Sequence, residues 1–90
     1  IADVIYFVPQ DCKLDLEARS RGTTVYLVDR RLDMLPAVLS EDLCSLRGGT
    51  DRLCVSVFWE FDAQQRILST RFARTVVHNS FALAYRDAQY

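Results

Sequence analysis

The clearest pattern of apolar and polar positions lies between residues 53 and 61. One face of this segment carries a regular set of large apolar side chains, namely Leu53, Val55, Val57, Trp59 and Phe61. Alternation with a period of two residues is typical of a β-strand. Residues 62–66 form a compact polar loop, and residues 67–78 resume as a second long strand. We therefore predict an antiparallel hairpin over this region.

The start of the chain predicts a strand followed by a helix. Residues 1–8 are rich in β-branched and aromatic side chains, and Pro9 would end the strand because it lacks a backbone donor. Residues 13–21 contain good helix formers. Asp11 is placed to cap the start of that helix, and Gly22 is placed to end it.

The middle of the chain predicts an extended stretch, a loop and a second helix. Residues 23–28 are β-branched and aromatic, and they lead into a charged loop. Apolar positions over residues 36–46 follow helical spacing, with a proline at the favourable first position. Ser40 could instead interrupt this helix and cap a second short turn. In either case the pair of glycines at positions 48 and 49 would end it.

These elements predict the α+β class, with a largely antiparallel mixed sheet and short helices, because strands and helices follow one another without a regular βαβ repeat. The residues from Asn79 onward are expected to turn helical. Ninety residues form at most one domain. No stretch approaches the roughly 20 apolar residues of a membrane span. Because the chain opens within an apolar run, without a preceding turn, we expect it to be a segment of a longer protein.

Composition offers little direct chemistry. Cys12, Cys44 and Cys54 include no closely spaced pair, and a structural zinc site would need all three together with His78. We expect three reduced, mostly buried thiols in an intracellular protein. A lone histidine near a strand end is more often structural than catalytic. The nine aspartates are scattered without a D-x-D cluster, so we assign no catalytic residue and no metal ligand.

Residues 21–46 gather the features that point to a ligand. Ten of the eleven basic residues of the chain are arginines, and two of them, Arg30 and Arg31, follow Tyr26 closely. A basic loop beside an aromatic ring can hold single-stranded nucleic acid, with guanidinium groups on phosphates and the ring on a base. Tyr26, Arg30 and Arg31 are therefore the candidate RNA-binding residues. The other interpretation is that Tyr26 is a core residue of a strand.

Within the same span the sequence resembles a known family. The run YLVDRRLDMLPAVLSEDLCSL, preceded by LDLEARSRGTTV and followed by DRLCVSVFWEFD, is similar to the catalytic RNB domain of the ribonuclease II and ribonuclease R family. It is most similar to the eukaryotic branch that includes the exosome exoribonuclease. The opening IADV resembles the family's HIADV segment, and the closing ALAYRDAQ resembles its Ser/Thr-Tyr-x-x-Ala-Gln ending. The likeness covers nearly the whole chain.

The resemblance implies a processive, magnesium-dependent 3′-to-5′ hydrolase that releases nucleoside monophosphates from single-stranded RNA. It implies that Tyr26 stacks near the 3′-terminal nucleotide, and that Arg30, Arg31 and the turn at residues 33–36 form channel wall. Asp3 would support the family's aspartate cluster rather than bind metal. Tyr6 departs from the family, which often has histidine at that position.

The resemblance also sets the expected domain content. Residues 1–90 would be a partial RNB domain that lacks the upstream aspartate cluster and the downstream remainder, so this segment alone should be inactive. The expected partners are single-stranded RNA and the exosome complex, in the nucleus or the cytoplasm. The alternative is a non-catalytic RNA-binding or protein-binding module derived from the same domain. A third interpretation is a self-contained small α+β domain with a chance likeness.

Overall fold

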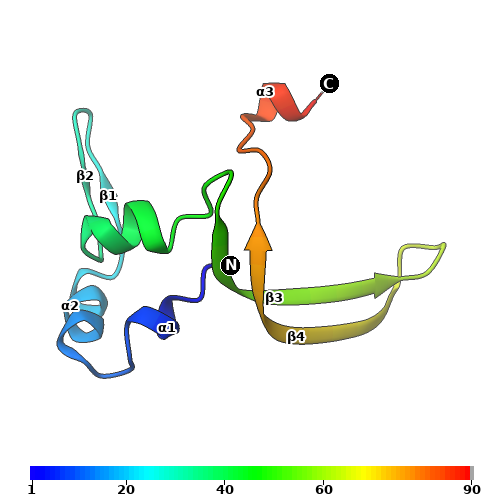
Figure 1. Cartoon of the computed structure of the whole chain (residues 1–90), viewed down its shortest axis with the longest axis horizontal. Coiled ribbons are helices and arrows are strands. Elements are labelled where there is room, and N and C mark those ends of the chain that lie inside the picture. Colours follow the sequence, from blue (N-terminus) through cyan, green and yellow to red (C-terminus); the bar gives the residue numbers. More distant parts are fainter. Residues whose placement is uncertain (90) are drawn as a thin grey trace.

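A long antiparallel hairpin organises the computed structural model, which describes residues 1–89 (Figure 1). Strands β3 (Asp51–Phe61) and β4 (Ile67–His78) pair from Asp51↔His78 to Phe61↔Ile67, with a register shift at Glu60/Phe61. The predicted hairpin is confirmed. Its two strands bend so that the base lies beside the helices while the tip extends away from them.

The predicted strand over residues 1–8 is wrong. Only Ala2 forms a β-bridge, with Cys54, through hydrogen bonds from the Asp3 N–H to the Leu53 carbonyl (2.9 Å) and from the Val55 N–H to the Ile1 carbonyl (2.8 Å). The chain then turns into the short helix α1 (Val4–Phe7). β-branched and aromatic residues favour strands only where a neighbouring strand pairs with them, and here that pairing stops after one residue.

Helix α2 (Lys13–Arg21) confirms the predicted helix, but its start differs. Cys12 is the N-cap residue and makes no capping hydrogen bond through its side chain. Asp11 does not cap the helix; its own backbone N–H donates to the Asp15 carboxylate at 2.7 Å. Gly22 ends the helix in the left-handed conformation, with φ of 72°, as predicted.

The expected charged loop after residue 28 is partly wrong, because it contains a strand. Strands β1 (Val25–Tyr26) and β2 (Arg31–Leu32) form a short antiparallel hairpin. The extended stretch predicted over residues 23–28 is thus regular at only two positions. The Leu27 N–H donates to the Arg30 carbonyl at 2.8 Å, which closes the turn between the strands.

The second predicted helix is shorter than expected and has more residues per turn than an α-helix. Helix η1 (Val38–Leu43) is a π-helix, and the Cys44 N–H donates to the Leu39 carbonyl five residues before it. Ser40 lies inside this helix and caps no second turn. The helix ends before the two glycines, so their predicted role as its terminus is wrong. The closing segment is helical only over α3 (Tyr85–Ala88). Residues 79–84 are not helical, so the helix predicted from Asn79 onward is wrong over its first six positions.

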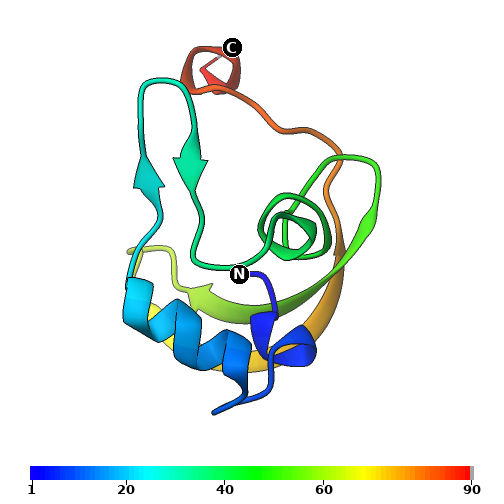
Figure 2. The ribbon, with the colours of Figure 1, turned by 90° about the vertical axis from the view of Figure 1, so that its left-hand side faces the viewer.

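The described chain is open rather than compact. Its radius of gyration is 16.4 Å, whereas a compact domain of this length has about 12 Å. Only four apolar residues are buried, namely Val8, Ala18, Leu39 and Cys54. In the view of Figure 2, α1, α2, η1 and the β1–β2 hairpin lie in front of the outer part of β3 and β4, which extends away behind them. The architecture is α+β, as predicted. Within residues 1–89 no helix is long and apolar enough to cross a membrane.

Candidate nucleic-acid interface

The β1–β2 hairpin carries all three candidate RNA-binding residues. Tyr26 pairs with Arg31 across the two strands, so both side chains lie on one face of the hairpin. Arg30 lies in the turn, beside an exposed Asp29. The predicted cluster therefore comes together on one projecting element.

Tyr26 is not a core residue of the described chain. It is 74% exposed, although it lies in a strand. A two-residue strand at the edge of the molecule has no second layer that could cover the ring. An exposed aromatic ring leaves its face free to stack on a base.

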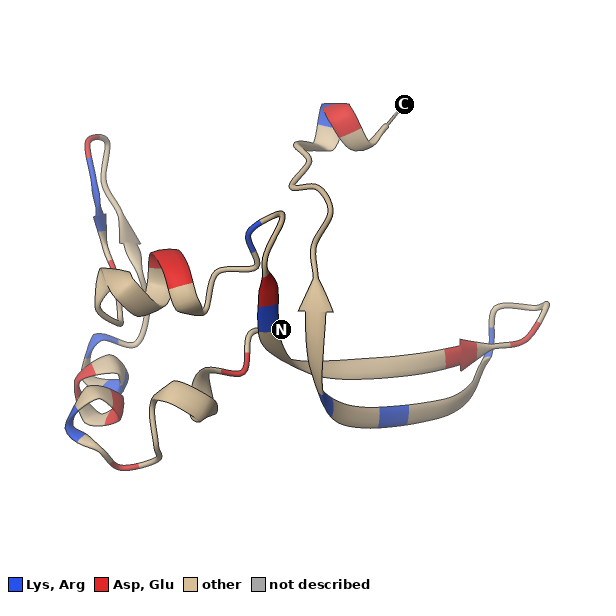
Figure 3. Cartoon of the chain, viewed as in Figure 1, with Lys and Arg blue, Asp and Glu red and all other residues tan. Residues whose placement is uncertain are grey.

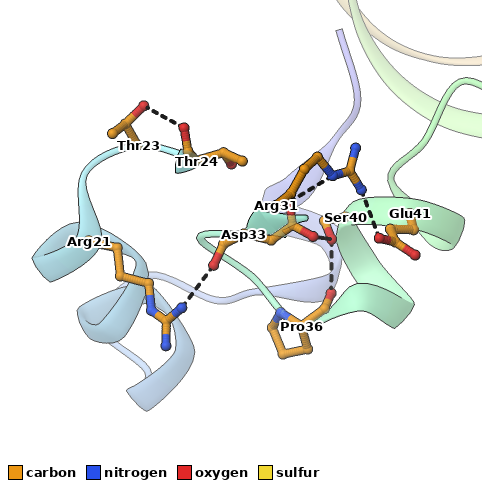
Figure 4. A network of polar contacts seen from close by, with 8 residues as sticks. All are labelled: Arg21, Thr23, Thr24, Arg31, Asp33, Pro36, Ser40 and Glu41. Atoms are coloured by element: carbon orange, nitrogen blue, oxygen red, sulfur yellow. Dashed lines mark hydrogen bonds and ion pairs between the residues drawn. The ribbon is translucent and has the colours of Figure 1, made fainter. Parts of the chain in front are cut away.

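The two arginines differ in their surroundings. The Arg31 guanidinium donates to the Glu41 carboxylate at 2.8 Å, and its Nε lies 3.5 Å from Asp33 Oδ1 (Figure 4). The hydrogen bond to Glu41 is the main cause that raises the pKa of Arg31. Arg30 has no ion-pair partner within residues 1–89. Arg30 is therefore the more available of the two for a phosphate group.

Asp33 links this hairpin to two helices. The Ser40 hydroxyl on η1 donates to Asp33 Oδ2 at 3.0 Å, and the Arg21 guanidinium at the end of α2 donates to the Asp33 carbonyl at 3.0 Å. Figure 4 shows these contacts converging just after β2. The residues that follow, Met34 and Leu35, line two adjoining hollows of about 180 and 390 Å³. The turn at residues 33–36 therefore borders concave surface, and its role as channel wall stays a prediction.

Among the described residues, Asp3 is the one charged residue that is buried. It is 5% exposed, and both of its carboxylate oxygens accept hydrogen bonds from the Arg74 guanidinium, at 2.8 and 3.2 Å. The same hydrogen bond raises the pKa of Arg74. Asp3 is thus engaged in holding the start of the chain onto β4. Sequence analysis did not identify Arg74, because 71 residues separate the two partners.

The acidic side chains of the described chain do not fit a magnesium site. Most of them pair with arginines, and residues of both signs intermingle along α2 and around β2 (Figure 3). Within residues 1–89 no group of three His, Cys, Asp or Glu side chains lies close enough to hold a metal ion. All three cysteines are free, but only Cys54 is buried, so the expectation of mostly buried thiols is wrong. His78 Nδ1 lies 2.7 Å from the exposed Asp51 carboxylate.

Comparison with known proteins decides the family. The protein-family model described as "RNB domain" matches residues 1–90 of the sequence. The chain belongs to the RNB domain family. Its sequence is 53% identical over 89 residues to the exosome complex exonuclease RRP44 homolog A of Arabidopsis thaliana, and 49% identical to the exosome complex exonuclease dis3 of Schizosaccharomyces pombe. The predicted resemblance is confirmed, including its exosome branch.

A solved structure agrees with the RNB assignment. Mycoplasma genitalium RNase R in complex with double-stranded RNA matches 99% of this chain with a TM-score of 0.93 and 30% sequence identity. The RNB chain covers only 16% of that protein. The sequence matches likewise include 99% of this chain, but only 10% of the Arabidopsis relative and 9% of the Schizosaccharomyces pombe relative.

Proposed function

We propose that this RNB chain forms part of a processive, magnesium-dependent 3′-to-5′ exoribonuclease, in which it lines the channel for single-stranded RNA. The observation that carries the proposal is the projecting β1–β2 hairpin with its exposed Tyr26, in a chain whose relatives are named exonucleases. The full-length protein would release nucleoside monophosphates. Association with the exosome complex, in the nucleus or the cytoplasm, belongs to the same proposal because the relatives are named exosome exonucleases.

The hairpin supplies two kinds of contact to RNA. The Tyr26 ring offers a face for a terminal base, and stacking of this kind contributes about 1–3 kcal/mol per base. Arg30 offers a guanidinium to a neighbouring phosphate. Arg31 is held by two carboxylates and is the least available of the three candidates. In this proposal these groups bind and orient the RNA end and take no part in the chemical step.

Hydrolysis then depends on parts of the full-length protein outside these ninety residues. A magnesium ion, when bound there, would supply the activated water and stabilise charge on the phosphate. The described residues offer no ligand set for it. The segment would therefore cover one side of the channel, and the aspartates that hold the ion would come from other parts of the full-length protein.

An activity assay tests this proposal directly. The full-length protein should shorten a 5′-labelled single-stranded RNA from its 3′ end in magnesium, and the isolated ninety-residue chain should release no nucleotide from it. Binding without cleavage by the full-length protein would instead support the alternative, a non-catalytic RNA-binding module. Monophosphate release by the isolated chain would contradict the assignment of catalysis to other parts of the protein.

A further inference from the structure

We propose that Arg31 is a positioning residue and not a direct contact to RNA. Through its pair with Glu41 it holds the β1–β2 hairpin, which carries Tyr26, against helix η1. This inference deepens the proposed function and rests on it. It changes the predicted role of one candidate residue and adds Glu41 to the set that controls RNA binding.

The β1–β2 hairpin is too short and too exposed to be held in place by its own packing. Strands β1 and β2 contain two residues each, and an isolated two-stranded hairpin is marginally stable at best in water. All four strand residues are exposed, and Val28 in the turn is fully exposed. Burial of apolar surface within residues 1–89 therefore does little to fix the hairpin's position.

Hydrogen bonds from the second strand and the residue after it hold the hairpin against η1. Arg31 of β2 donates a hydrogen bond to Glu41, and Asp33, directly after β2, accepts one from Ser40. Two hydrogen bonds therefore connect the second strand to η1. Glu41 lies on η1, the helix that also carries the buried Leu39. Because Tyr26 faces Arg31 across the hairpin, a change at the Arg31–Glu41 pair moves the ring most directly.

The two roles of Arg31 predict opposite effects of removing Glu41. If Arg31 bound RNA, loss of a neighbouring negative charge would leave RNA affinity unchanged or increase it, because phosphate binding is electrostatic. If Arg31 positions the hairpin, Glu41→Ala should weaken binding. Since both partners are exposed, the variant leaves no buried charge unpaired and should fold.

The experiment measures the affinity of the full-length protein for a short fluorescent single-stranded RNA, without divalent metal. Glu41→Ala and Arg31→Ala should each weaken binding roughly two- to fivefold, the range of one exposed ion pair. The double variant should bind no more weakly than Arg31→Ala, because the pair acts as one unit. In a Tyr26→Ala background, Glu41→Ala should have no further effect. Glu41→Gln, which can still accept the hydrogen bond, should restore part of the affinity.

Glu60→Ala is the matched control, because it removes the same charge from the tip of the long hairpin, away from this network. It should leave affinity and melting temperature unchanged. Unchanged or tighter binding by Glu41→Ala, or additive losses in the double variant, would overturn the positioning role while leaving RNA binding intact. If the unaltered protein binds no single-stranded RNA, the proposed function itself fails, and the two failures are thereby distinguished.

Discussion

Tyr26 can be altered with little effect on folding, since its ring packs against almost nothing in the described chain. At 74% exposure it contributes little buried apolar surface. Most aromatic residues in strands stabilise a core, and their replacement therefore confounds stability with function. Here the two effects separate at a single residue.

We expect Tyr26→Ala to weaken binding of a short single-stranded RNA by about 5- to 150-fold, which corresponds to the loss of one base stack. Tyr26→Phe retains the aromatic face and should bind like the unaltered protein. Fluorescence anisotropy on the full-length protein checks both variants, with melting temperatures as the folding control. Equal affinities for all three proteins would remove Tyr26 from the RNA-binding site.

Helix α2 ends through a conformational requirement at one residue. Gly22 has a φ of 72°, and a Cβ added there would meet only the Arg19 carbonyl oxygen, at 3.9 Å. Space is therefore available, and the cost of any side chain comes from the backbone conformation alone.

Gly22→Ala should lower the free energy of unfolding by about 1–2 kcal/mol, because a left-handed backbone is unfavourable for an L-residue with a Cβ. Gly48→Ala is the matched control, since Gly48 has no positive φ and its added Cβ would make ordinary contacts at 3.7 and 3.8 Å. Urea denaturation of the full-length protein measures both. Equal stabilities of the two variants would contradict this explanation of the helix end.

The turn between β3 and β4 depends on one carboxylate. Asp62 accepts hydrogen bonds from the backbone N–H groups of Arg66 and Gln64, both at 2.9 Å, and from the Arg66 guanidinium at 2.7 Å. Led by the backbone bond from Arg66, these contacts lower the pKa of Asp62 below its usual value of 3.8. The ionised carboxylate is thus the form that the folded turn favours.

This shift predicts a stability that depends on pH. Because the folded pKa lies below the unfolded one, the contribution of Asp62 is present above pH 3.8 and is lost as the pH falls through the lower folded value. The unaltered protein should be more stable than Asp62→Asn at neutral pH, and the difference should narrow in acid. Denaturation curves at several pH values test this expectation, and a constant difference would contradict it.

At the scale of the whole molecule, the outer half of the long hairpin is an uncovered apolar ribbon. Six large apolar residues there are 42–72% exposed, namely Phe58, Trp59, Phe61, Ile67, Leu68 and Phe72. They occupy both faces, because Trp59 and Phe72 lie on one side while Phe58 lies on the other beneath the Arg71 guanidinium, at 4.1 Å. Exposed apolar surface of this extent is typical of an interface.

The isolated ninety-residue chain should therefore bind a hydrophobic dye such as ANS strongly and associate with itself. Phe58→Ser combined with Phe72→Ser should reduce both effects, because the pair removes apolar surface from each face. Size-exclusion chromatography with light scattering checks the association. A monodisperse monomer without dye binding would contradict the interpretation of this ribbon as an interface.

Local interactions explain which elements could be predicted from the sequence. The period-two pattern at residues 53–61, the glycine that ends α2 and the β4 segment each depend on neighbours a few residues away, and each prediction is confirmed. The sequence also identifies Tyr26, Arg30 and Arg31 as one candidate cluster, because they lie within six positions of one another. The family followed from motifs, which are also local.

Contacts between distant segments decided the rest. Residues 1–8 have the composition of a strand, yet a single bridge to Cys54 was available and the chain turned helical beyond it. The Asp3–Arg74 and Arg31–Glu41 pairs join residues that no sequence pattern connects. Only the folded chain therefore shows that Arg31 pairs with Glu41 while Arg30 lies exposed in the turn. Propensity and spacing act along the chain, whereas burial and charge pairing depend on what the fold brings into contact.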